Sequence, residues 1–404
     1  MPKLATLLLG LPLLMTACAA PGGAGDAGAA SPSAIPHGYI AGAQEQPEPQ
    51  IGLLTVDQKS GTSHLLSLLT EATVDTGAFG RVDAVEQEGR YAFVTAEGLV
   101  HVLDTGAWTV DHGDHKHYYS AEPGSVGTIS VPGAGAVAGD GMSVAVFSTS
   151  EGYASVYRHE DLDAGIVAEK ARTTSTPHQG RVIPYGDHFI VSIAGQDGTA
   201  PMGIEVRDAD NQVVLPQQSC PGLSAHTWTR VGVVLSCADG ALLVRENDGA
   251  FAAEKIPYPA EAAGLPPVTK LEHRPGSNEL AAPAGEKGIW HLNVSKKTWT
   301  LLATPVPVVA ASAVGDGKRV LALGVDGSLM SVDPAKGTLS ARAQLLEPLP
   351  PTRDTMPQIR IDSSRAYLSD PGRSRALEID YKADLRVART FDLPASDIML
   401  EVGL

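Results

Sequence analysis

The side chains best suited to binding a metal ion crowd into one short stretch of this chain. Asp111 to His117 holds three histidines and two aspartates in seven residues, whereas the whole chain has 12 histidines. His115 and His117 are two residues apart, so both imidazoles leave the same face of an extended strand. His112 can fold back onto that face if Gly113 turns the chain. The spacing therefore predicts a cluster of three imidazole rings.

Zinc binding is the chemistry that suits this cluster. Neutral imidazole nitrogens with one carboxylate oxygen are a ligand set of Zn²⁺. We predict that His112, His115 and His117 supply nitrogen ligands. Asp114 is either a fourth ligand or a hydrogen-bond partner that orients a ring. A solvated histidine-rich loop between two strands is the alternative at this point.

The start of the chain is typical of an exported lipoprotein. Lys3 is followed by an apolar run, Leu4 to Leu14, that is too short to span a bilayer. Met15 to Cys18 then looks like a lipobox, which predicts a signal peptide at 1–17 and a lipid on the Cys18 thiol. Ordinary secretory cleavage near Ala20 is the alternative, and the chain is exported in either case.

The next segment, 18–35, carries the lipidated cysteine and is rich in Ala, Gly, Pro and Ser. Such a composition buries too little apolar area to fold, so we expect a flexible tether. The predicted location is the outer face of the cell membrane, periplasmic or at the cell surface.

Two cysteines remain after Cys18. In an oxidising compartment, Cys220 and Cys237 are expected to form one disulfide. A zinc site on the two thiols is the alternative.

The charge balance excludes several partners. Lys and Arg total 30 and Asp and Glu total 46, which gives a formal net charge of −16. Such a chain is unsuited to binding nucleic acid or docking on anionic lipid. We expect membrane contact through the lipid anchor only, and a monomer.

The remainder, 36–404, is predicted to be a single all-β domain, a β-propeller. Short apolar runs rich in Val, Ile, Leu and Tyr alternate with Gly/Asp turns, and the unit recurs every 41 to 51 residues or so, the spacing of propeller blades. We favour eight blades, with seven as the alternative. Strands from His37–Gly42, Ile51–Asp57 and His64–Leu68 would form one blade with Ile398–Val402, and this pairing of the two chain ends closes the ring.

Three further histidines, His178, His226 and His273, lie near the predicted innermost strands of later blades. Innermost strands line the central channel of a propeller. These rings are candidates to converge with the cluster at one mouth of the channel. A structural, hydrogen-bonded histidine is the alternative for each of them.

Catalytic motifs are absent from the sequence. It contains no Gly-x-Ser-x-Gly elbow, phosphate-binding glycine loop or His-Glu-x-x-His helix. We therefore expect a protein that is not an enzyme.

Several motifs resemble the AztD family of periplasmic zinc metallochaperones. The strongest is Asp111 to Tyr119 followed by Ala121 to Pro123, and weaker matches are His37 to Tyr39, Cys220 to Leu223 and Cys237 to Gly240. The resemblance implies a propeller that holds Zn²⁺ and passes it to the zinc-specific solute-binding protein of an ABC transporter.

The chain departs from the family pattern at three places. No histidine lies between Cys18 and His37, where the family tends to carry a histidine-rich stretch. Ser224, rather than histidine, follows Cys-Pro-Gly-Leu. Pro132 to Gly135 stands where a further channel histidine is expected.

Three functions therefore compete. The first is an extracytoplasmic zinc metallochaperone that uses the histidine-rich loop. The second is a metal-independent propeller that binds a protein or glycan partner through its channel face. The third is a lactonase-like or hydrolytic propeller enzyme, which needs a convergent set of carboxylates in the channel that the sequence does not reveal.

The anchoring hypothesis is tested by the Cys18→Ala change. Because the thiol accepts the lipid, the variant is expected in the soluble fraction or as unprocessed precursor, measured by membrane fractionation and mass spectrometry. A variant that still partitions with membranes like the parent would contradict the lipobox interpretation.

Overall fold

Short antiparallel β-strands make up nearly all of the described chain. The computed structural model describes residues 40, 42–112, 114–196, 198–350, 355–394 and 397–404. The chain divides into two compact units, Met1–His37 and Gly38–Leu404, and the described residues all belong to the second. The predicted signal peptide, Cys18 and the tether lie outside the described residues. No helix in the described ranges is long and apolar enough to cross a membrane.

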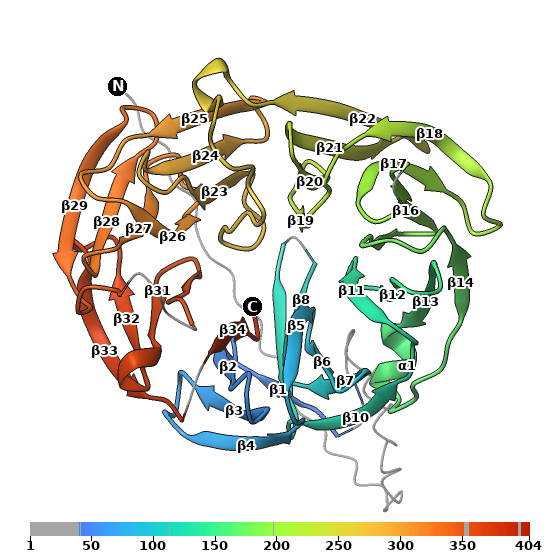
Figure 1. Cartoon of the computed structure of the whole chain (residues 1–404). Helices are drawn as coiled ribbons and strands as arrows, with labels where there is room; N and C mark the ends of the chain where they lie inside the picture. The colour runs from blue at the N-terminus through green and yellow to red at the C-terminus, as the bar shows by residue number, and fades with distance from the viewer. Residues whose placement is uncertain (1–39, 41, 113, 197, 351–354, 395–396) are drawn as a thin grey trace, which may run out of the picture. The chain divides into compact units, whose positions relative to one another are not determined.

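The first four sheets each have four strands, which follow one another from the inner to the outer edge (Figure 1). They are β34 (Ile398–Val402), β2 (Gly52–Val56), β3 (Thr62–Ser67) and β4 (Thr73–Ala78); β5 (Val82–Glu88), β6 (Tyr91–Ala96), β7 (Leu99–Asp104) and β10 (Gly124–Ile129); β11 (Ala134–Gly139), β12 (Ser143–Ser148), β13 (Tyr153–Arg158) and β14 (Ala171–Thr174); and β15 (Val182–Tyr185), β16 (His188–Ala194), β17 (Pro201–Arg207) and β18 (Val213–Ser219).

The next four sheets follow in the same sense. They are β19 (Ala225–Trp228), β20 (Val233–Cys237), β21 (Gly240–Asn247) and β22 (Ala250–Pro257); β23 (Glu279–Pro283), β24 (Ile289–Asn293) and β25 (Thr298–Leu302); β26 (Val308–Ala313), β27 (Val320–Gly324), β28 (Ser328–Asp333) and β29 (Thr338–Gln344); and β30 (Ile359–Ile361), β31 (Ala366–Asp370), β32 (Arg375–Asp380) and β33 (Arg386–Asp392).

A ninth, three-stranded sheet joins β1 (Gln44–Gln46), β9 (Lys116–Ser120) and β8 (Ala107–Asp111). Helical structure in the described residues is limited to α1 (His159–Asp163), η1 (Ala260–Ala262) and η2 (Pro371–Arg373). Neighbouring sheets of the ring contact one another in chain order, and the last contacts the first through β30 and β34. The propeller fold is confirmed; the count of eight blades, which this arrangement favours, stays a prediction.

Burial on both faces explains why many strands have consecutive apolar residues rather than an alternating pattern. The second strands are mostly buried, and β2, β6 and β20 are buried at every residue. Each is covered on both faces, because sheets stack face to face around the ring. The outer strand β4 is mostly exposed and polar.

The two chain ends close the ring as predicted. β34 pairs antiparallel with β2, from Gly52 opposite Val402 to Val56 opposite Ile398. The prediction that His37–Gly42 forms a strand of this sheet is wrong, because its described residues are not in a strand. The sheet's remaining strand is β4, which follows β3 in the chain. The error arose because polar β4 has no apolar run of its own.

Cys220 and Cys237 form the predicted disulfide, with their Cα atoms 5.0 Å apart. Cys220 follows β18 and Cys237 ends β20, so the bond links two neighbouring sheets. Both residues are buried. The alternative of a zinc site on these thiols is therefore wrong.

Loss of this disulfide is expected to lower the free energy of unfolding by about 3 kcal/mol, because the bond closes a short loop in the unfolded chain. The measurement is urea unfolding of the Cys220→Ser, Cys237→Ser double variant against the oxidised parent. An unchanged unfolding midpoint and slope would contradict this expectation.

Candidate metal centre

The histidine-rich stretch forms the tip of a β-hairpin. β8 and β9 pair from Ala107 opposite Ser120 to Asp111 opposite Lys116. The last pair is also joined by an ion pair of 3.0 Å between Lys116 Nζ and Asp111 Oδ2. Beyond it, the His112 N–H donates to the His115 carbonyl at 3.0 Å. The hairpin therefore returns the chain on itself between the first and second histidine.

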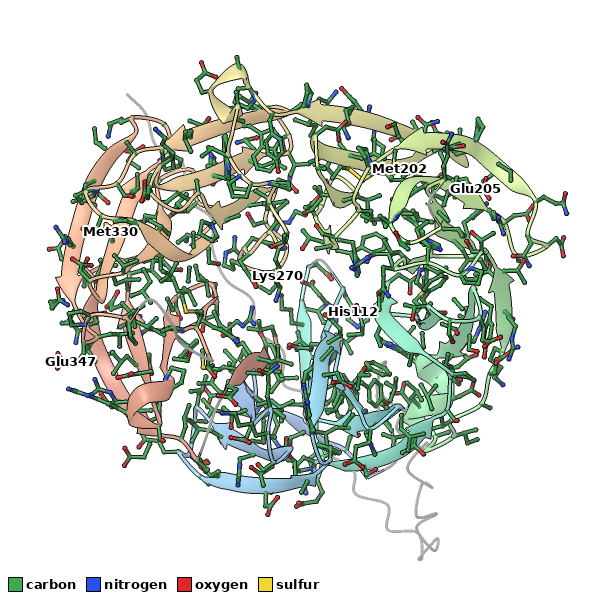
Figure 2. The ribbon with its side chains drawn as sticks, viewed as in Figure 1. His112, Met202, Glu205, Lys270, Met330 and Glu347 are labelled. Carbon is green, nitrogen blue, oxygen red and sulfur yellow. A yellow bond between two sulfur atoms is a disulfide. The ribbon has the colours of Figure 1, made fainter. Side chains whose placement is uncertain are left out.

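The hairpin is an insertion within one sheet. It lies between β7 and β10, which pair with each other. The chain leaves this sheet after β7 and returns to it at β10. Figure 2 draws His112 toward the middle of the ring.

The structure brings the three imidazoles together. Ligand atoms of His112, His115 and His117 all lie within 4.8 Å of one another. The ring centroids are 4.9 Å apart for His112 and His115, 5.3 Å for His112 and His117, and 5.0 Å for His115 and His117. Nitrogens bound to one tetrahedral zinc ion lie about 3.3 Å apart. Small ring movements are enough to reach that spacing, so the donor set fits Zn²⁺.

Two carboxylates orient the rings. Asp114 Oδ1 lies 2.8 Å from His115 Nδ1, and Glu45 Oε1 lies 2.7 Å from His117 Nδ1. A carboxylate accepts a hydrogen bond from the N–H of the ring nitrogen that it faces, which leaves the lone pair on Nε2 for a metal ion. Asp114 thus sits against a ring, the second of its two predicted roles.

Glu45 is the site residue that sequence reasoning missed. It belongs to β1, which pairs with β9 so that Glu45 lies opposite Tyr119 and diagonal to His117. Glu45 is 72 residues away from His117 along the chain. The Gln-Glu-Gln sequence of β1 carries no signal of this pairing.

Stacked rings connect the hairpin to its sheet. The His117 and Tyr119 centroids are 6.3 Å apart, and Tyr119 stacks on Trp108 at 5.3 Å. The Arg90 guanidinium lies 3.9 Å from the Trp108 ring centroid, and its Nε donates to Asp104 Oδ1 at 3.0 Å. Tyr119 is fully buried. Burial, with the Glu45 carboxylate nearby, raises the pKa of Tyr119. The exposed tip therefore stands on a packed base.

His178 lies apart from this cluster. Its Nδ1 is 2.6 Å from the Thr176 carbonyl and its Nε2 is 2.7 Å from Ser192 Oγ, so both ring nitrogens have partners. The ring is buried against Phe147, and burial lowers the pKa of His178. This arrangement matches the structural alternative.

His226 and His273 do line the channel, in a cavity of about 520 Å³. The Arg181 guanidinium donates to His226 Nδ1 at 3.0 Å. Burial and this charge lower the pKa of His226 to about 3. His273 donates through Nδ1 to the Arg274 carbonyl at 2.6 Å. Burial lowers the pKa of His273.

The channel is poorly suited to a second cation. An arginine beside His226 repels a metal ion. Burial raises the pKa of Glu88, another lining residue, to about 8, so that side chain is largely neutral at pH 7. Throughout the described ranges, only His112, His115 and His117 form a group of three potential ligand residues within 4.8 Å.

Comparisons with known proteins agree with this architecture. No family model matches the chain. The zinc chaperone AztD of Citrobacter koseri is 24% identical over an alignment of 310 residues, and the match covers 72% of this chain and 70% of that protein. The likeness to AztD is confirmed.

Solved structures of AztD from Citrobacter koseri extend the likeness. One superposes with a TM-score of 0.75 and the apo form with 0.73, each at 20% identity over 88% of this chain and 98% of the other. The dihydro-heme d1 dehydrogenase NirN reaches 0.56 at 14% identity, covering 89% of this chain and 76% of that one. At these identities the structures show the fold alone.

Proposed function

We propose that this protein is an extracytoplasmic zinc metallochaperone that holds Zn²⁺ at the β8–β9 hairpin and delivers it to the zinc-specific solute-binding protein of an ABC transporter. The observation that carries the proposal is the set of three imidazoles within 4.8 Å. The likeness to the zinc chaperone AztD supports it. In this proposal the protein is a non-catalytic monomer, anchored outside the cell membrane through Cys18.

The donor set suits a carrier better than a permanent site. Structural zinc sites are closed by four protein ligands, whereas three ligands leave one position open. His115 is 57% exposed, so this position is accessible to an incoming ligand. A ligand from the acceptor can enter there before an imidazole leaves, which is the simplest route for direct transfer.

We expect the ring of sheets to fold without bound zinc. The ligands lie at the tip of an insertion, and its base is held by strand pairing and by the rings of Trp108 and Tyr119. Removing the ion should therefore leave the ring of sheets intact.

Replacing His115 and His117 together with Ala is expected to abolish tight zinc binding, because two of three nitrogen ligands are lost. The measurement is competition with a chromophoric chelator, with circular dichroism as the test of folding. His188→Ala, on β16, is the matched control and should bind Zn²⁺ with the affinity of the parent. Unchanged affinity in the double variant would refute the site, and loss of fold with metal would make the site structural.

Glu45→Gln is expected to weaken zinc binding about 10- to 100-fold, the usual effect of removing a carboxylate that orients a metal-binding histidine. Zinc competition measures the affinity, and ¹⁵N NMR of His117 reports which ring nitrogen carries the proton. Glu48→Gln removes the same charge three residues away and should change neither. If Glu45→Gln leaves both affinity and tautomer unaltered, Glu45 does not orient the ring.

A further inference from the structure

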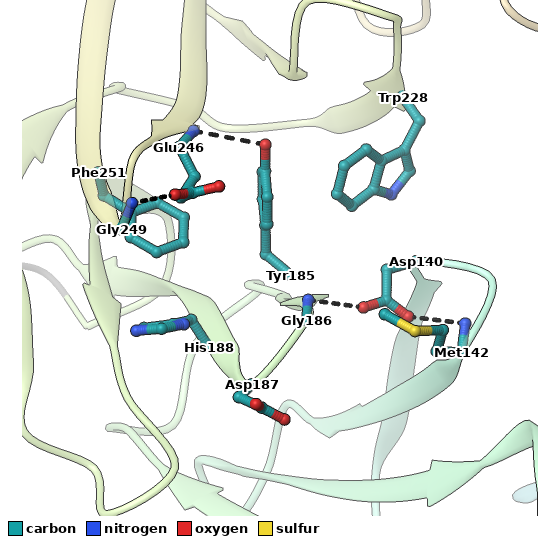
Figure 3. Close-up of a pocket in the computed structure, with 10 residues that line it drawn as sticks. All are labelled: Asp140, Met142, Tyr185, Gly186, Asp187, His188, Trp228, Glu246, Gly249 and Phe251. Carbon is teal, nitrogen blue, oxygen red and sulfur yellow. Dashed lines mark hydrogen bonds between the residues drawn. The ribbon is translucent and has the colours of Figure 1, made fainter.

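A cavity distant from the histidine hairpin combines aromatic rings with carboxylates. It has a volume of about 430 Å³ and opens between the turns of three consecutive sheets. Figure 3 shows the ten residues that line it. This volume lies in the usual range for small-molecule sites.

Three half-buried rings form a continuous aromatic wall. Tyr185 lies between Trp228 and Phe251, with centroids 4.9 Å and 5.1 Å away, and His188 lies 4.8 Å from Phe251. The Trp228 N–H and the Tyr185 hydroxyl oxygen both contact the backbone. Trp228 Nε1 donates to the Gly139 carbonyl at 2.6 Å, and Tyr185 Oη accepts the Glu246 N–H at 3.4 Å. What these rings offer a ligand is therefore π surface in fixed positions.

The charged groups around this wall are carboxylates. Asp140, Asp187 and Glu246 line the cavity, and none of its ten lining residues is a lysine or arginine. Asp140 is held in place by the N–H groups of Met142, Ser143 and Gly186, at 2.8 to 2.9 Å. The cavity is thus preorganised and negative, beside rings whose faces attract cations.

This combination favours an organic cation over a metal ion. Calcium takes six to eight oxygen ligands, whereas both oxygens of Asp140 already accept backbone hydrogen bonds. A quaternary ammonium group is weakly hydrated, and its charge is attracted to aromatic faces and carboxylates together. We infer that this cavity binds a small solute bearing a quaternary ammonium group, independently of zinc.

The test is calorimetric titration of the exported chain with choline and with its neutral carbon isostere, 3,3-dimethylbutan-1-ol. Choline should bind at least tenfold more tightly, and it should shift the NMR signal of the Trp228 indole N–H. Equal binding of the isostere, or no binding of choline, overturns the inference. Vesicles of phosphatidylcholine form a second arm, and binding to vesicles without binding to free choline overturns the assignment to a solute.

Two variants locate the site. Phe251→Leu removes one ring, and Glu246→Gln removes one charge; each should weaken choline binding about tenfold. Glu347→Gln, an exposed acid elsewhere, is the matched control. Circular dichroism verifies the fold of each variant. Choline affinity that is unaltered in both folded variants overturns the inference, whereas the His115, His117 double variant should bind choline like the parent.

Discussion

The pairing of β34 with β2 is the contact on which the rest of the fold depends. Each sheet of the ring buries its faces against two neighbours, so the first and last sheets need each other. Met399 of β34 packs in one cluster with Leu53 of β2 and Tyr367 of the last sheet. Leu400 and Val402 pack with Leu54 and with the second sheet. Without β34, β2 would become an edge with unpaired backbone groups, and both clusters would open.

The histidine hairpin is an insertion between two strands of one sheet. A closed ring of sheets tolerates such an insertion. β7 and β10 pair directly, so the sheet is complete without β8 and β9. The hairpin adds its own small sheet with β1 and stands on the half-buried ring of Trp108 and the buried ring of Tyr119. Under the proposed function, an ion held on this insertion could be exchanged without disturbing the core.

The same residue type has opposite surroundings in the hairpin and in the channel. His115 and His117 face the carboxylates of Asp114 and Glu45, which stabilise a cation nearby. His226 is half-buried and faces the guanidinium of Arg181, which disfavours any further positive charge. The neighbouring charges therefore make the hairpin histidines, and not His226, candidates for holding a metal ion.

Features that depend on residue type and on short-range spacing could be predicted from the sequence. Alternating apolar runs and turns predicted the propeller, the apolar run Ile398–Val402 predicted the closing strand, and two cysteines in an exported chain predicted the disulfide. The spacing of His112, His115 and His117 predicted the cluster. Each of these features is encoded in consecutive residues or in residue type.

Only the tertiary structure decided which distant segments meet. It placed Glu45 on His117 through the pairing of β1 with β9, and it made polar β4 the outer strand of the first sheet. It also buried His178 between Thr176 and Ser192, away from the channel. Strand pairing depends on backbone hydrogen bonds that every residue can form, so the side chains of β1 and β4 do not reveal their partners in the sequence.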